Sequence, residues 1–215
     1  DGDVKASQVT ELREEISAIL QIAQPEDEVV VKLESPGGVV HGYGLAASQL
    51  QRLRDQHIPL TVIVDKVAAS GGYMMACVAD EIIAAPFAII GSIGVLAQLP
   101  NFHRFLKKKD IDFELLTAGE YKRTLTMFGE NTQKAREKTQ EDLEEIHRLF
   151  KDFIEKNRKD VNIDEVATGA HWLAQDALSL NLVDKLITSD DYLSNQASSG
   201  QANIYELQYL AKKSM

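Results

Sequence analysis

The chain has 215 residues, of which 44% are hydrophobic and 26% charged, as in a soluble globular protein large enough to bury a proper core. Its 33 acidic residues outnumber 23 lysines and arginines, and the net charge of -10 argues against nucleic acid as a partner. No apolar run reaches the roughly 20 residues that span a bilayer. The only cysteine, Cys77, excludes an internal disulfide, and its apolar neighbours predict a buried, inert thiol.

The first half of the chain alternates between patterns typical of helices and of strands. Apolar residues at helical spacing predict a helix over Glu11–Ile22, with Ser7 or Thr10 as its cap. The elements expected next are a strand over 28–33, a helix over about 43–55, a strand over 60–64, a helix from Ser70 and a strand over 81–85. This alternation predicts an α/β fold with a mainly parallel sheet covered by helices.

The second half begins with short apolar pieces and then becomes helical. We expect short, kinked strands over 87–96, a strand over 112–117, a long amphipathic helix over 133–158, a helical piece over 172–180, an apolar segment at 182–187, a linker over 194–201 and a terminal strand over 204–210. These patterns predict one domain over 1–190, which includes the long helical region at 131–160. A C-terminal linker and terminal segment over 191–215 would follow it.

Ser70 is the first candidate for a reactive residue. It lies in the small-residue stretch Val67–Tyr73, which follows the apolar run Leu60–Val64 and precedes a predicted helix. A nucleophile at a strand-to-helix turn needs small neighbours because the bend is tight, and the helix then directs backbone N–H groups at the group attacked. The alternative is a glycine-rich turn that contains a serine incidentally.

A second glycine-rich turn, Glu34–Val39, follows the predicted strand over 28–33. The carboxyl ends of parallel strands meet at one edge of a sheet, where open α/β sheets place their sites. The amide of Gly37 or Gly38 could therefore face the amide of Gly71 and provide two donors for a developing oxyanion. One well-placed donor of this kind lowers the barrier by ~3 to 4 kcal/mol.

An activated serine also needs a base, and the residues alone leave this choice open. His41 adjoins the glycine turn, whereas the other four histidines lack a context that suggests a triad; they are His57, His103, His147 and His171. A desolvated, neutral lysine is the other option. Lys122 lies just after the strand predicted over 112–117, beyond Gly119, which is a suitable place for such a base. The same position also suits a solvated lysine in a loop.

Four motifs in this order resemble the signal peptide peptidase A family of serine proteases: Glu34–Gly38, Ala68–Tyr73, Gly91–Val95 and Gly119–Lys122. The similarity extends from about Val9 to Asp184. The flanking segments resemble the family's SohB-like branch in particular, at His41–Leu50, Val64–Val67 and Pro100–Phe102. The resemblance implies the fold shared by Clp proteases and crotonases, and an enzyme that needs no metal or cofactor.

The resemblance also implies a role for each site residue. Ser70 would be the nucleophile of a Ser–Lys dyad and Lys122 its general base. The Gly71 amide, with one from the turn at Gly37 and Gly38, would form the oxyanion hole. Ser92 would accept a hydrogen bond from the lysine amine and orient it. The expected activity is hydrolysis of peptide bonds after small or apolar residues, in signal-peptide remnants or other membrane-associated polypeptides.

The family further implies homo-oligomeric rings and a membrane anchor at the N-terminus, with the catalytic domain in the periplasm, and we expect this chain not to include the anchor. This chain would then be a soluble fragment. Two other functions stay open. One is a crotonase-type enzyme that acts on acyl-CoA, since that fold also uses two amides as an oxyanion hole. The other is a non-catalytic scaffold subunit of the same fold, against which the presence of Ser70 and Lys122 counts.

Overall fold

The structure is a computed structural model that describes residues 2–24, 26–200 and 203–210. The chain divides into two compact units. Unit 1 consists of Asp1–Gly94 and Phe150–Met215, and unit 2 consists of Val95–Leu149. Every strand that the described residues form belongs to unit 1. The expected division at 190 and 191 stays a prediction.

Two small sheets form the centre of unit 1. Sheet A has four parallel strands in the order β1-β2-β4-β7: β1 (Val29–Lys32), β2 (Leu60–Val64), β4 (Glu81–Ala84) and β7 (Lys185–Leu186). Sheet B has the order β3-β5-β6: β3 (Val67–Ala69), β5 (Ile89–Gly91) and β6 (His171–Leu173). In sheet B, β3 and β5 are parallel and β5 and β6 are antiparallel. The expectation of a mainly parallel α/β fold is confirmed.

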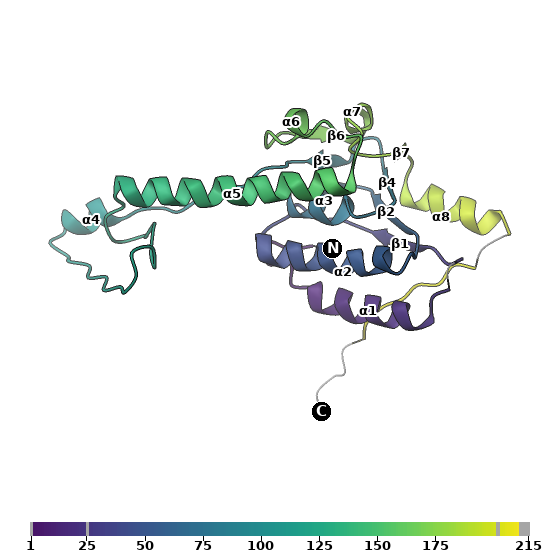
Figure 1. Cartoon of the computed structure of the whole chain (residues 1–215), viewed down its shortest axis with the longest axis horizontal. Helices are drawn as coiled ribbons and strands as arrows, with labels where there is room; N and C mark the ends of the chain where they lie inside the picture. The colour runs from purple at the N-terminus through teal and green to yellow at the C-terminus, as the bar shows by residue number, and fades with distance from the viewer. Residues whose placement is uncertain (1, 25, 201–202, 211–215) are drawn as a thin grey trace. The chain divides into compact units, whose positions relative to one another are not determined.

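Helices flank these sheets within unit 1: α1 (Val9–Ile22), α2 (Val40–Asp55), α3 (Gly71–Ala76), α6 (Ile163–Val166), α7 (Ala174–Ser179) and α8 (Ser189–Ser198). Helix α1 packs against α2, and α2 packs against α3 (Figure 1). The long helix α5 (Gln133–Asn157) confirms the predicted amphipathic helix and runs from unit 2 into unit 1.

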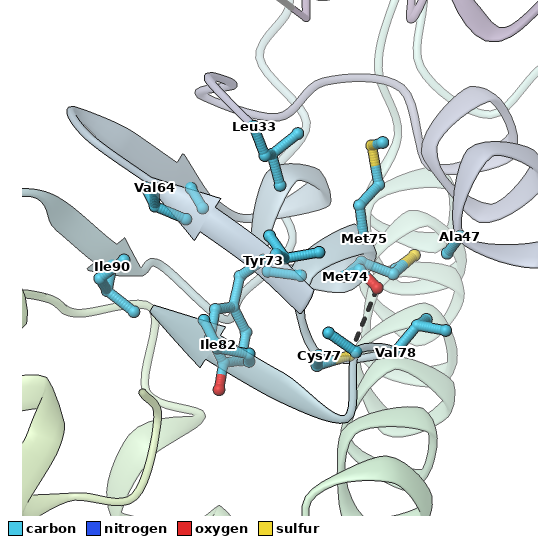
Figure 2. Packing of buried hydrophobic residues seen from close by; sticks show 14 of the residues in the cluster. Leu33, Ala47, Val64, Tyr73, Met74, Met75, Cys77, Val78, Ile82 and Ile90 are labelled. Atoms are coloured by element: carbon cyan, nitrogen blue, oxygen red, sulfur yellow. Dashed lines mark hydrogen bonds between the residues drawn. The ribbon is translucent and has the colours of Figure 1, made fainter. Parts of the chain in front are cut away.

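The short helix α3 lies in the middle of the core. All six of its residues are buried, and Cys77, which follows it, is buried too. Figure 2 shows Tyr73 and Met74 of this segment among apolar side chains that include Ile82 of β4 and Ile90 of β5. Burying an apolar side chain of this size stabilises a fold by about 1.5–3 kcal/mol. Ser70, which directly precedes α3, is therefore attached to a helix that is packed on all sides.

Polar contacts tie this core to the C-terminal part of unit 1. The Tyr73 hydroxyl donates to the carbonyl of Leu182 at 2.9 Å. The Arg158 guanidinium binds both carboxylate oxygens of Asp184, each at 2.8 Å. Burial raises the pKa of the Tyr73 phenol and of the Cys77 thiol far above their ordinary values, so both stay neutral. The predicted inert character of Cys77 agrees with this burial.

Several expected boundaries in the first half were wrong in detail. Helix α1 begins after Gln8, which makes no capping hydrogen bond through its side chain, so neither Ser7 nor Thr10 is its cap. The Ser7 hydroxyl instead donates to the Asp3 carboxylate at 2.8 Å. Strand β3 was not expected, because three residues carry too little periodicity to be recognised without their partner strand.

The second half contains more corrections. Residues 112–117 form no strand but an exposed irregular segment, because no strand of unit 2 lies beside them to accept their hydrogen bonds. The expected helix over 172–180 divides into β6 and α7. The expected linker over 194–201 is helical as far as Ser198, at the end of α8, and its residue 201 lies outside the described part of the chain. Residues 204–210 form no strand, although the Tyr209 amide donates to Glu15 of α1 at 2.9 Å.

Unit 2 contains α4 (His103–Lys107) and the first part of α5. Its irregular segments are held by local contacts, including the pair of hydrogen bonds from Asn101 Nδ2 to the carbonyls of Thr126 and Gly129, at 2.8 and 3.0 Å. None of the residues of Val95–Leu149, all of them described, is fully buried.

Within the described ranges of the whole chain, no helix is long and apolar enough to cross a bilayer.

Candidate active site

Ser70 occupies a sharp turn between β3 and α3. Its backbone has φ +52° and ψ -118°, a conformation that residues with a side chain rarely adopt and that marks strain at functional sites. The turn is fixed on both sides, because the Ser70 amide donates to the Gly91 carbonyl at 2.7 Å and the Ser70 carbonyl accepts from Met74 at 2.9 Å. The residue is partly exposed. This is the arrangement of a nucleophile elbow.

The glycines after Ser70 are needed for close packing. A β-carbon on Gly71 would overlap the ring of Tyr43, and one on Gly72 would overlap the carbonyl oxygen of Ser35. The small residues that the sequence placed around Ser70 therefore have a steric cause. They let α2 and the segment at Ser35 approach the turn.

Gly37 brings the second glycine turn against Ser70. Its φ of +84° favours glycine, and a β-carbon there would lie 2.6 Å from the amide nitrogen of Gly71 and 2.8 Å from the Ser70 β-carbon. The expectation that these two turns meet is confirmed.

The amides of the two turns differ in what they bind. The Gly37 amide donates to Ser35 Oγ at 3.1 Å, so this donor is already used. The amides of Gly38 and Gly71 donate to no group within the described residues. Of the three glycine amides expected at the oxyanion hole, these two are therefore the ones without a partner in the described part of the chain.

Ser92 lies beside Ser70 at the end of the neighbouring strand. Gly91 of β5 pairs with Ala69 of β3, and each is followed directly by one of the two serines. Adjacent strands lie about 4.8 Å apart, so the two serines are neighbours. Like Ser70, Ser92 has a φ of +52° and is partly exposed, and its amide donates to the Ala170 carbonyl at 2.7 Å.

Lys122 belongs to unit 2 and is exposed, in an irregular segment next to α5. The residues before it fix this segment. Glu120 forms an ion pair with Lys134 of α5, and the Tyr121 ring lies 5.8 Å from the ammonium groups of both Lys134 and Lys138. The Lys134 ammonium holds the pKa of the Glu120 carboxyl below its usual range. Within the described part of unit 2, the Lys122 ammonium has no hydrogen-bond or ion-pair partner.

One histidine without a supporting sequence context, His171, lies in the same sheet as the strand that precedes Ser70. His171 of β6 pairs with Gly91 of β5, which itself pairs with Ala69 of β3. It is exposed and lies roughly 10 Å from Ala69 across two strand spacings. No local signal marks this residue, because its proximity depends on the antiparallel addition of β6. His41, favoured from the sequence, is exposed in the first turn of α2.

The site contains no evident place for a metal ion. Among residues 2–24, 26–200 and 203–210, no group of three or more His, Cys, Asp or Glu side chains is arranged to bind one. The expectation that the reaction needs no metal or cofactor stays a prediction.

The structure thus places a strained serine at a strand-to-helix turn of an α/β unit, against a second, glycine-rich turn. Comparison with known families identifies the group. Residues 52–203 match the model described as "Peptidase family S49", and residues 1–50 match "Peptidase family S49 N-terminal". The chain therefore belongs to peptidase family S49, which confirms the resemblance drawn from the motifs.

Relatives within this family are close. The chain is 59% identical over 214 residues to "Probable protease SohB" of Haemophilus influenzae, covering 100% of this chain and 60% of the relative. It is 63% identical over 192 residues to "Probable protease SohB" of Buchnera aphidicola subsp. Schlechtendalia chinensis, covering 89% of this chain and 63% of the relative. The chain thus spans about three fifths of the length of these relatives.

Proposed function

We propose that the chain is the catalytic part of a serine endopeptidase in which Ser70 is the nucleophile and Lys122 the general base. The observation that carries this proposal is the turn at Ser70, whose strained backbone meets the second glycine turn at Gly37. The choice of Lys122 rests on the family motif Gly119–Lys122. The Clp protease/crotonase-like fold is part of the same proposal, supported by the parallel strands and the paired glycine turns.

In the first step, Ser70 Oγ attacks the carbonyl carbon of the peptide bond while its proton passes to the neutral Lys122 amine. The carbonyl oxygen becomes an oxyanion and accepts hydrogen bonds from the amides of Gly71 and Gly38. Gly38 is the better second donor because the Gly37 amide is bonded to Ser35. Each such donor lowers the barrier by ~3 to 4 kcal/mol.

In the second step, the tetrahedral intermediate collapses and the C–N bond breaks. The leaving amine takes the proton from the Lys122 ammonium, and the acyl group stays on Ser70 as an ester. Lys122 then removes a proton from water, which attacks the ester carbonyl carbon. The ester C–O bond breaks, the acid product leaves, and the Lys122 ammonium returns the proton to Ser70 Oγ. Ser92, next to Ser70, would accept a hydrogen bond from the lysine amine and orient it.

A lysine acts as a base at neutral pH only when it is desolvated, because burial lowers its pKa. Lys122 is exposed and unit 2 has no buried residue. Unit 2 also exposes large apolar side chains, among them Phe105, Leu116 and Leu96. Exposed apolar surface of this kind typically marks an interaction site. We therefore propose that copies of the chain assemble, in a ring as the family resemblance implies, and that assembly desolvates the lysine.

The proposed substrates are membrane-associated polypeptides cleaved after small or apolar residues, including signal-peptide remnants. Membrane anchorage and a periplasmic location of the catalytic part belong to the same proposal. Their support is the family resemblance of the four sequence motifs, since the relatives' names state only a protease.

The test compares hydrolysis of a quenched peptide library by the wild type and by Ser70→Ala, Lys122→Ala and His171→Ala. Ser194→Ala and Lys109→Ala, at exposed positions, serve as matched controls. The proposal requires loss of activity in Ser70→Ala and Lys122→Ala alone. Loss in His171→Ala with activity retained in Lys122→Ala would make the histidine the base. No activity in the assembled wild type would favour a scaffold.

Mixing the two inactive variants separates two arrangements of the dyad. If the serine and lysine of one site come from adjacent copies, an assembly of Ser70→Ala with Lys122→Ala contains some complete sites and regains activity. If both come from one chain, no mixture regains it. Native mass spectrometry of the mixture provides the necessary control that mixed assemblies form.

A further inference from the structure

A chain of hydrogen bonds lies behind the glycine turn. The Gly37 amide donates to Ser35 Oγ at 3.1 Å, Ser35 Oγ lies 2.6 Å from the Tyr43 hydroxyl, and this hydroxyl donates to the Asp3 carbonyl at 2.8 Å. Ser35 and Tyr43 are 0% and 1% exposed. Buried hydroxyl groups reduce stability unless they are paired, and both of these are fully paired.

The number of hydroxyl protons determines which group donates and which accepts in each of these hydrogen bonds. A carbonyl oxygen only accepts, so the single hydroxyl proton of Tyr43 points to Asp3. The Ser35 hydroxyl must then donate to the Tyr43 oxygen, and its own oxygen is left to accept from Gly37. The Gly37 N–H, which belongs to the Pro36–Gly37 peptide, completes this sequence of donors and acceptors by pointing at Ser35 Oγ.

Tyr43 also contacts the other turn. Its ring lies so close to the α-carbon of Gly71 that a β-carbon there would overlap it. One side chain from α2 therefore touches the turn at Gly71 directly and reaches the turn at Gly37 through Ser35. The main chain of Ser35 is in turn bonded to β3, because its carbonyl accepts from Ala69 at 3.0 Å.

We propose that Tyr43 and Ser35 are positioning residues for the oxyanion hole. They fix the Pro36–Gly37 peptide through the Gly37 N–H, and thereby restrict the next peptide, Gly37–Gly38, whose N–H is the free amide of Gly38. The role of this restriction is to keep the Gly38 amide at a fixed separation from the amide of Gly71. Displacement of a catalytic group by about 1 Å can cost about 100-fold in rate. This role rests on the proposed function, since it concerns the same site.

The variants that test this role are Tyr43→Phe, which removes one hydroxyl and keeps the ring, and Ser35→Ala. The matched control is Tyr73→Phe, because the Tyr73 hydroxyl is also buried and also donates to a backbone carbonyl, that of Leu182. Tyr43→Phe and Tyr73→Phe should lose similar stability in urea, so a difference in catalysis between them reports position rather than folding.

Tyr43→Phe is expected to lower kcat by about 10- to 100-fold with little change in KM, because the oxyanion forms only after binding. Affinity for a peptide boronate, whose adduct with Ser70 places an oxygen in the oxyanion hole, should fall by a similar factor. Affinity for the cleaved product peptide should not change. The double variant Tyr43→Phe/Ser35→Ala should be no slower than the slower single variant, since both break one chain of bonds.

Two results would overturn the inference while leaving the proposed function intact. One is a kcat for Tyr43→Phe and Ser35→Ala within about twofold of the wild type, in a protein whose hydrolysis depends on Ser70. The other is an equal loss of kcat in Tyr73→Phe. Hydrolysis by the wild type that survives in Ser70→Ala would instead overturn the proposed function, and this inference with it.

Discussion

The most informative single substitution is Gly37→Ala, because it adds one methyl group at the contact between the two turns. The new β-carbon would lie 2.6 Å from the Ala69 carbonyl oxygen, 2.6 Å from the Gly71 nitrogen and 2.8 Å from the Ser70 β-carbon. Two of these neighbours are backbone atoms, which cannot rotate away as the end of a side chain can.

The expected loss of stability has two sources. An alanine held at φ +84° is strained by about 1–2 kcal/mol relative to glycine. Forcing a methyl group into a filled site adds about 1–3 kcal/mol. We therefore expect Gly37→Ala to lower the free energy of unfolding by about 2–5 kcal/mol.

The same displacement should move the Gly38 amide away from the oxyanion, which lowers kcat by about 100- to 1,000-fold. Urea denaturation and peptide hydrolysis, both below the melting range of the variant, measure the two effects separately. Gly44→Ala is the matched control, because its new β-carbon, in the second turn of α2, would have no atom within 4 Å other than those of its own turn of helix. That variant should gain up to about 1 kcal/mol from helix propensity and keep its activity.

A Gly37→Ala protein whose free energy of unfolding is within about 0.5 kcal/mol of the wild type would contradict this expectation. That outcome would mean that the two turns do not meet as described. A destabilised variant that keeps full kcat would refute only the role of this turn in the oxyanion hole.

Three further predictions concern other parts of unit 1. Arg158→Ala, which leaves the Asp184 carboxylate without its buried partner, should lower the free energy of unfolding in urea by about 3 kcal/mol. Cys77 should resist iodoacetamide at pH 8 in the folded protein and react in urea, since burial raises the pKa of its thiol; rapid alkylation without urea would contradict this. Hydrogen bonds from Ser7 lower the pKa of the Asp3 carboxyl below its ordinary 3.8, so its stabilising effect is present above that pH and disappears as the pH falls through the lowered value. The difference in melting temperature between wild type and Asp3→Ala should therefore shrink between pH 6 and pH 3, and a constant difference would show that the carboxylate makes no such contribution.

Much of the central fold could be predicted from the sequence because its strands are continuous apolar runs. The run at 60–64 became β2, whose five residues are all buried, and 81–85 became β4 beside it. Short strands could not be predicted in this way. Strands β3 and β6 have three residues each, and they are defined by their pairing with neighbouring segments, above all with β5. The reverse error at 112–117 has the same cause, since an apolar pattern without a partner strand forms no sheet.

The candidate site could be predicted in part. The small residues around Ser70 and the glycines at 37 and 38 are local signals of tight turns, and the structure brings these turns together. The contribution of Ser35 and Tyr43 could not be predicted, because it depends on contacts between α2 and the segment at Asp3. The choice of Gly38 over Gly37 as the free donor also required the direction of a hydrogen bond that the sequence does not contain.

The central claim, that Ser70 is the nucleophile, is tested most directly by covalent trapping. A peptidyl fluorophosphonate reacts with an activated serine and leaves a stable adduct, which intact mass spectrometry counts and peptide mapping locates. Our account predicts one adduct per active site, on Ser70, and none in either Ser70→Ala or Lys122→Ala. An adduct on a different residue, or none on Ser70 in a preparation that hydrolyses peptides, would contradict it.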